Sequence, residues 1–198
     1  MDVPFSLACN FNVFSFIRPR KSPGYLTPFE EWVCSLVNSS GAVAISQVCA
    51  NSRQKQKLKN LARLGILSLH RLEGFYIDKP VIHNVLTPGP FPGVLPVLKR
   101  LALTHLLLGI DCPPVLSVSD EEFVIFQDDT EYRVFVHREP EPITPYIVRA
   151  QKHLSFILVE RYYPELGVLD PDSCRVLLDT EDVFRLPDGT PENAVYIG

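Results

Sequence analysis

The most restrictive feature of this sequence is a run of basic residues between positions 53 and 63. The run contains five basic side chains and no acidic one: Arg53, Lys55, Lys57, Lys59 and Arg63. Apolar residues recur through it at helical spacing: Leu58, Leu61, Ala62 and Leu64. We therefore predict an α-helix, capped by Asn51 or Ser52, with one buried face and a cationic outer face. Such a face is suited to nucleic-acid phosphates, although charge runs often only solvate an ordinary surface helix.

Two further helices are predicted before this basic helix. The first begins with Thr27 as its N-cap, Pro28 at the first helical position and Glu30 placed to complete a capping box, and it is expected to end at Asn-Ser-Ser-Gly, residues 38–41. Residues 42–45 are then predicted to be extended. Ser46 is placed to cap a brief second helix that ends near residue 50.

A hairpin is predicted after the basic helix. Gly65 is placed to end the helix in a left-handed conformation. Strands at 66–71 and 75–78 are predicted to be joined through residues 72–74, where a glycine supplies the positive φ that such turns often need. Residues 81–86 are a further strand candidate. These parts stand in the order of a winged helix, a DNA-binding variant of the helix-turn-helix.

The chain is divided by charge. Residues 1–110 carry 12 basic and 5 acidic side chains, whereas residues 111–198 carry 7 basic and 18 acidic ones. With 198 residues, 46% of them hydrophobic, the chain can bury the core of one large or two small domains. We predict an N-terminal arm or edge strand, a winged helix, a Pro-rich linker with an apolar helix, and an acidic α/β domain: residues 1–25, 26–86, 87–110 and 111–198.

The acidic domain is predicted to contain a mixed sheet with one or two helices. Short β-branched and aromatic runs indicate five strands: 115–118, 122–126, 132–137, 154–159 and 175–178. A turn is expected at 127–130, a helix at 143–153 and a capped helical turn at 180–184. The predicted fold class is therefore α+β, with a winged helix-turn-helix followed by a small mixed α/β region.

Residues 94–110 are the most apolar helix candidate. Its predicted inward positions are Leu95, Leu98, Leu101, Ala102, Leu106 and Ile110. Because apolar residues occur almost all round it, we expect this helix to pack in the core, or against a second copy of the chain. Winged-helix DNA binders usually pair, since one module neutralises few phosphates, so a homodimer is the predicted assembly.

The five cysteines indicate reduced thiols in a cytoplasmic protein. They are odd in number, widely spaced and without metal-ligand spacing: Cys9, Cys34, Cys49, Cys112 and Cys174. We expect Cys34 and Cys49 to be buried. No window reaches the roughly 18 apolar residues that a membrane-spanning helix needs, and the basic residues at 18–21 follow the N-terminal apolar run, the wrong order for a secretory signal.

Four segments resemble the N-terminal winged helix of the replication-relaxation family, whose members occur on plasmids, phages and conjugative elements. They are Leu-Thr-Pro-Phe-Glu at 26–30, Ala-Ile-Ser-Gln-Val at 44–48, Leu-Ala-Arg-Leu-Gly-Ile-Leu at 61–67 and Gly-Phe-Tyr at 74–76. In that family a small acidic region, similar to a degenerate restriction-endonuclease fold, follows the winged helix. The resemblance implies non-enzymatic binding of double-stranded DNA in replication, transfer or transcription control.

Eight side chains are the predicted DNA-binding residues: Arg53, Gln54, Lys55, Lys57, Lys59, Asn60, Arg63 and Arg71. We expect Arg53, Gln54, Lys57 and Asn60 to line the groove, and Lys55, Lys59 and Arg63 to hold backbone phosphates. Glu73 in the predicted wing turn argues against a wing that grips the minor groove, and leaves His70 and Arg71 as its basic residues. The alternative is an assembly module whose winged helix and acidic domain bind protein partners.

A metal-dependent nuclease is a weaker alternative. Its candidate carboxylates are Asp128, Asp129, Glu131 and Glu160. Phosphodiester hydrolysis needs carboxylates that hold a divalent ion and a lysine that orients water, and neither acidic segment has such a lysine nearby. The histidines at 83, 105, 137 and 153 lack a metal spacing, and no phosphate-binding glycine motif is present. We therefore predict no catalytic residue, no metal and no cofactor.

Overall fold

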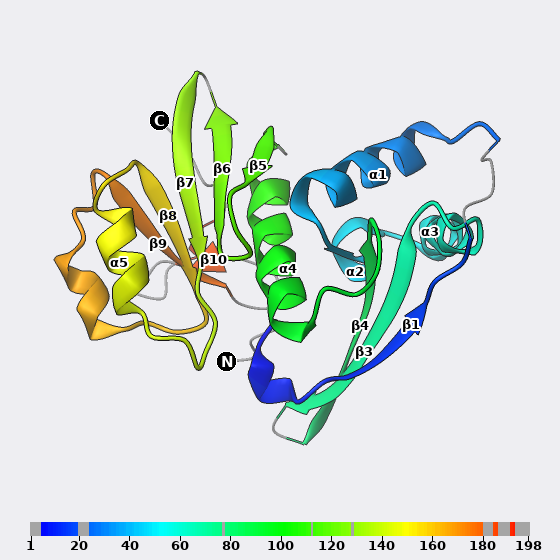
Figure 1. Cartoon of the computed structure of the whole chain (residues 1–198), viewed down its shortest axis with the longest axis horizontal. Coiled ribbons are helices and arrows are strands. Elements are labelled where there is room, and N and C mark those ends of the chain that lie inside the picture. The colour runs from blue at the N-terminus through cyan, green and yellow to red at the C-terminus, as the bar shows by residue number, and fades with distance from the viewer. Residues whose placement is uncertain are drawn as a thin grey trace. The chain divides into compact units, whose positions relative to one another are not determined.

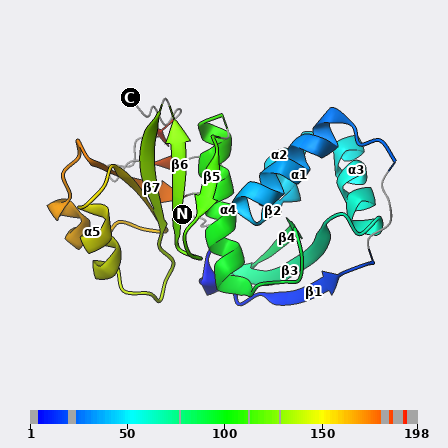
Figure 2. The ribbon, with the colours of Figure 1, turned by 45° about the horizontal axis from the view of Figure 1, so that its top comes forward.

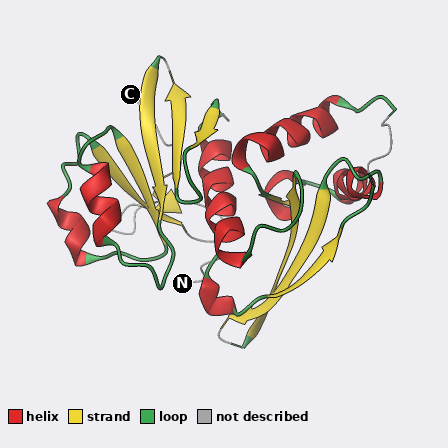
Figure 3. Ribbon diagram, viewed as in Figure 1, coloured by secondary structure: helices red, strands yellow, loops and turns green. Residues whose placement is uncertain are grey.

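The fold is mixed α+β. A computed structural model describes residues 5–19, 24–76, 78–111, 113–127, 129–179, 184–185 and 191–192. Those residues form five α-helices and two sheets (Figure 1, Figure 3). Contacts divide the chain into two units, one of residues 8–104 and one of residues 1–7 with 105–198. The boundary falls within helix α4 (Val94–Gly109).

The unit of residues 8–104 contains a four-stranded antiparallel sheet and three of the helices. Its elements run β1 (Asn12–Phe16), α1 (Pro28–Ser40), β2 (Val43–Ala44), α2 (Ile45–Val48), α3 (Ser52–Arg63), β3 (Ser68–Tyr76) and β4 (Lys79–Thr87). The strand order is β1-β3-β4-β2. Figure 2 shows β1 at the outer edge of the sheet, beside β3. The predicted edge strand is therefore confirmed.

The predicted helix starts and stops are confirmed at three points. The Glu30 carboxylate accepts hydrogen bonds from the Thr27 backbone N–H at 2.8 Å and from its hydroxyl at 2.7 Å, which fixes the start of α1. Gly41, with φ of 82°, ends α1, and Gly65, with φ of 67°, follows α3. Both values lie in the left-handed region that glycine tolerates without strain.

The predicted cap of α2 is wrong. The helix begins at Ile45, and Ser46 is exposed within it. Gln47 has the capping role instead, because its side-chain oxygen accepts from the Ala44 N–H at 2.9 Å. Its amide also donates to the Leu101 carbonyl of α4 at 2.8 Å, so the same side chain ties α2 to α4.

The hairpin is longer than predicted, and its turn lies elsewhere. β3 runs without a break through residues 72–74, and the turn follows Tyr76, where Asp78 has φ of 63°. Gly74 is needed for a different reason. A Cβ there would lie 2.2 Å from the carbonyl oxygen of Cys9, so only glycine lets the N-terminal segment cross β3. Residues 81–86, a further strand candidate in the sequence, belong to the second strand of the hairpin.

The other unit contains a seven-stranded sheet whose strands follow chain order, β5 to β11. They are β5 (Val115–Ser117), β6 (Glu122–Gln127), β7 (Thr130–Val136), β8 (Ser155–Val159), β9 (Cys174–Asp179), β10 (Phe184–Arg185) and β11 (Pro191–Glu192). β7, β8 and β9 are parallel neighbours, and the remaining pairs are antiparallel. All five predicted strands are confirmed. Of the predicted helical turn at 180–184, residues 180–183 lie outside the described part, and Phe184 is in a strand.

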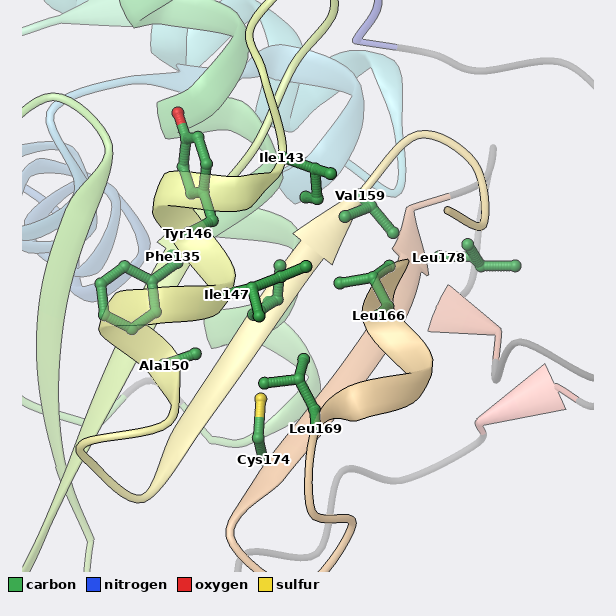
Figure 4. Packing of buried hydrophobic residues seen from close by; sticks show 11 residues of the cluster. Phe135, Ile143, Tyr146, Ile147, Ala150, Val159, Leu166, Leu169, Cys174 and Leu178 are labelled. Atoms are coloured by element: carbon green, nitrogen blue, oxygen red, sulfur yellow. The ribbon is translucent and has the colours of Figure 1, made fainter. Parts of the chain in front are cut away.

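Two short helices complete this unit by connecting the parallel strands. α5 (Thr144–Ala150) joins β7 to β8, and the 3-10 helix η2 (Pro164–Val168) joins β8 to β9. Figure 4 shows their side chains converging with those of the strands, Ile147 from α5 and Leu166 from η2 facing Val159. Every residue of β8 is buried, as its continuous apolar run predicts.

Helix α4 is buried on several sides, as its apolar composition predicts. Leu98, Leu101, Ala102 and Leu106 are buried, as is Ile110 directly after the helix, whereas Leu95 is only partly buried. Each helix in the described part of the chain is too short or too polar to cross a membrane.

The predicted burial of the cysteines is wrong in part. Cys34 and Cys49 are only partly buried, whereas Cys9 and Cys174 are buried. None of these four is in a disulfide, and Cys112 lies outside the described residues.

Candidate nucleic-acid interface

Helix α3 presents a cationic face to solvent. Asn51 caps it by accepting a hydrogen bond from the Gln54 N–H at 3.0 Å, as predicted. Leu58, Leu61 and Ala62 are buried on its inner side. Four of the five basic residues are exposed on the outer side: Arg53, Lys55, Lys59 and Arg63.

These four cations have no carboxylate partner among the described residues. α3 itself has no acidic residue, so its positive charges are not offset along the helix. Exposed and unpaired cations on one helix face attract polyanions, because binding releases the counterions that phosphates hold.

Lys57 differs from the other basic residues of α3. It is partly buried, and its Nζ donates to the Thr27 hydroxyl at 3.1 Å. Burial alone would raise the pKa of Glu30, but the hydrogen bonds from Thr27 and the charge of Lys57 hold it below its usual value. Lys57 therefore links α3 to the start of α1 within the unit, which is a structural role that the sequence did not indicate.

The amide side chains of α3 also form hydrogen bonds with residues near them in sequence. The Gln54 side-chain oxygen accepts from the Ala50 N–H at 2.8 Å, and the Asn60 oxygen accepts from the Gln56 amide at 3.2 Å. Gln56 and Asn60 are exposed, and Gln54 is partly so. The oxygens are therefore occupied by local contacts.

The basic residues of β3 provide less positive charge for DNA contact than predicted. Arg71 is exposed, but its Nε lies 2.5 Å from a carboxylate oxygen of Glu73. His70 is fully buried between the hydroxyls of Ser15 and Thr87, with ring nitrogens at 2.8 and 2.9 Å. Burial lowers its pKa, which favours the neutral ring. The suggestion that His70 is a basic wing residue is therefore wrong.

A second charged cluster lies in the unit of residues 105–198 and was not predicted. Arg138, Glu160 and Asp179 stand at the carboxyl ends of β7, β8 and β9, and all three are buried. A guanidinium nitrogen of Arg138 bonds to Asp179, and its Nε lies 3.6 Å from Glu160. His105 Nδ1 lies 3.0 Å from the other Asp179 oxygen. The cluster holds three parallel strand ends together.

Burial and two neighbouring groups, Arg138 and Ser6, set the protonation of Glu160. The Ser6 hydroxyl donates to its Oε2 at 3.3 Å, whereas its Oε1 has no hydrogen-bond partner among the described residues. Burial raises the pKa of Glu160 to about 6, and the charge of Arg138 offsets only part of that effect. Ionisation of Glu160 near neutral pH therefore lowers the stability of the folded protein.

This raised pKa predicts a pH dependence of stability. The folded protein keeps a proton on Glu160 that the unfolded chain, with a pKa of 4.5, has released. Stability should fall by about 2 kcal/mol as pH rises through this window, from below 4.5 to above 6, and then level off. The Glu160→Gln variant should lack that change. Urea unfolding of both proteins at pH 4.5 and 7.5 measures it, and a parallel response of the two would contradict the assignment.

The carboxylates suggested for a nuclease are not brought together. Asp129 is exposed at the turn before β7, Glu131 is exposed within β7, and Asp128 lies outside the described residues. Register places Glu131 seven positions from Glu160 along parallel strands, which is roughly 23 Å at 3.3 Å per residue. Glu131 instead pairs with Arg133 at 2.8 Å. Across the described part of the chain, no group of three potential metal ligands occurs.

Comparison with known proteins adds no relative: no family model, curated protein or solved structure matches this chain.

Proposed function

We propose that the unit of residues 8–104 is a winged helix that binds double-stranded DNA through α3. The order α1-β2-α2-α3-β3-β4 supports this proposal, because a winged helix has three helices with a short strand after the first and a hairpin at the end. β2 pairs with β4, and β4 with β3, so the short strand closes the hairpin sheet. In such folds the third helix is the one that enters the major groove.

The observation that carries the proposal is the exposed and unpaired charge of α3. Arg53, Lys55, Lys59 and Arg63 are available for phosphate contact, whereas Lys57 is held by Thr27. We assign phosphate contact to these four. We assign groove contact to Gln56 and Asn60, which are exposed on the same helix and would exchange their mutual hydrogen bond for contacts to base edges. Arg71 contributes less, because Glu73 neutralises it.

In this proposal the acidic unit has no enzymatic role and instead binds a second copy of the chain or a protein partner. The separation of its exposed acids from Glu160 disfavours the nuclease alternative. Resemblance of residues 26–76 to the replication-relaxation family favours a role in replication, transfer or transcription control of a mobile element. Pairing of two chains would double the phosphate contacts available to one DNA site.

Salt titration of duplex binding tests the proposal. Four phosphate contacts predict a slope of about −3.6 for log K against log salt, so affinity should fall by about 150-fold between 50 and 200 mM salt. Fluorescence anisotropy with a labelled duplex measures the slope. An affinity that does not respond to salt, or the absence of binding at low salt, would favour the assembly-module alternative.

A further inference from the structure

Exposed aromatic residues gather on one face of the sheet β1-β3-β4. Register places Phe14 of β1 opposite Arg71 of β3, and Arg71 opposite Asn84 of β4, so the three side chains project to the same face. Alternate residues along each strand share that face. We call it the aromatic face, and its exposed apolar members are Phe14 (50% exposed), Phe16 (56%), Phe75 (67%) and Ile82 (50%).

A pocket of about 280 Å³ continues this face to the start of α3. Ile82 and Asn84 of β4 form one wall, and Cys49, Asn51 and Lys55 contribute from the turn before α3 and from its first turns. Its volume is near the lower limit of small-molecule sites, which suits one planar ring with polar edges. Lys55 brings a cation of the basic helix to the pocket itself.

The charges beside the aromatic face favour a polyanionic occupant. The two charged groups in its central register rows, Arg71 and Glu73, neutralise each other. The net charge near the pocket is therefore that of α3, with Lys55 at the pocket and Arg53 close by in the same helix. A protein partner with an apolar surface would use the rings but would leave these cations unmatched.

We propose that the aromatic face binds an unpaired stretch of nucleic acid. Bases stack on Phe14 and Phe16, one base enters the pocket beside Asn84, and Lys55 contacts the backbone. Stacking on aromatic side chains is the general means of holding single strands, because every base has a flat face. Phe14 and Asn84 are two strand spacings apart, about 10 Å, so a short unpaired stretch spans them. This inference rests on the proposed function, since α3 supplies the electrostatic attraction.

Binding of single strands by matched variants tests the inference. The probes are a labelled oligothymidylate, an oligouridylate and a duplex of equal length, each followed by anisotropy. Phe14→Ala/Phe16→Ala should weaken single-strand binding at least tenfold and leave duplex binding within about twofold. Asn84→Leu should act in the same direction through the pocket. Phe126→Ala is the control, because Phe126 is an exposed phenylalanine on β6 of the other unit (42%).

The outcomes separate this inference from the proposed function. Duplex binding without single-strand binding would overturn the inference and leave the proposed function standing. Single-strand binding that the Phe14→Ala/Phe16→Ala variant retains would also overturn it. If that variant instead converts a dimer to a monomer in sedimentation, with unchanged single-strand affinity, the aromatic face is a self-contact and the inference fails. Circular dichroism confirms that each variant is folded.

Discussion

Replacing Arg138 with methionine should lower the free energy of unfolding by about 3–5 kcal/mol at neutral pH. Arg138 is fully buried and bonds to Asp179, which is fully buried as well. Among the described residues, its removal leaves that carboxylate with His105 as its one ionic partner, and leaves Glu160 without its neighbouring cation. A buried charge that loses its partner cannot recover its hydration, so the loss exceeds that of an ordinary ion pair.

Urea unfolding of the variant and a matched control measures this effect. Arg133→Met is the control, since Arg133 lies on β7, the strand that Arg138 follows, and pairs with Glu122 and Glu131 near the surface. It should cost no more than about 1 kcal/mol. In the Arg138→Met background, Asp179→Asn should restore part of the stability by removing the stranded charge. A loss for Arg138→Met no larger than that of the control would contradict the account of the cluster.

Reversing two charges on α3 should weaken duplex binding by about 200-fold at 50 mM salt. Arg53→Glu with Lys59→Glu removes two of the four proposed phosphate contacts, which lowers the salt slope by about 1.8 and gives this factor by counterion release. At 200 mM salt the same slope gives a loss of about 20-fold. Both side chains are exposed and without partners among the described residues, so the fold should tolerate the change.

The control for this variant is a charge reversal elsewhere. Lys152→Glu changes an exposed cation in the acidic unit and should leave affinity and slope nearly unchanged. Lys57→Gln is a second comparison, because the Nζ contact with Thr27 predicts a loss of stability and little change in affinity. Equal weakening by Lys152→Glu would mean that net charge, and not the position of α3, sets the affinity.

Local signals predicted much of the fold. The cap at Thr27 and the glycines at 41 and 65 act on neighbouring backbone, so the sequence alone indicates where those helices begin and end. Alternation and apolar runs likewise indicated the strands around the parallel core. The turn of the hairpin was mistaken because Gly74 is required by the carbonyl of Cys9, a contact between distant residues that no local pattern records.

The cationic face of α3 could be predicted from local sequence, whereas the buried charged cluster could not. The cations of α3 lie close together in sequence, so helical periodicity places them on one helix, although it did not reveal that Lys57 bonds to Thr27, 30 residues away. Arg138 and Asp179 are 41 residues apart, and His105 and Asp179 are 74 apart. One signal could have indicated the cluster: polar residues directly follow or end three apolar strands, where parallel neighbours bring their carboxyl ends together.

Amide chemical-shift mapping tests the central claim most directly, because it needs no substitution. The labelled protein is titrated with duplex DNA at low salt, and each backbone amide is followed. Our account predicts that the largest changes lie in α3, between Arg53 and Arg63, with smaller ones in the hairpin β3-β4 and almost none in β8 or β9. Changes centred on the acidic unit, or no change at any amide, would contradict it.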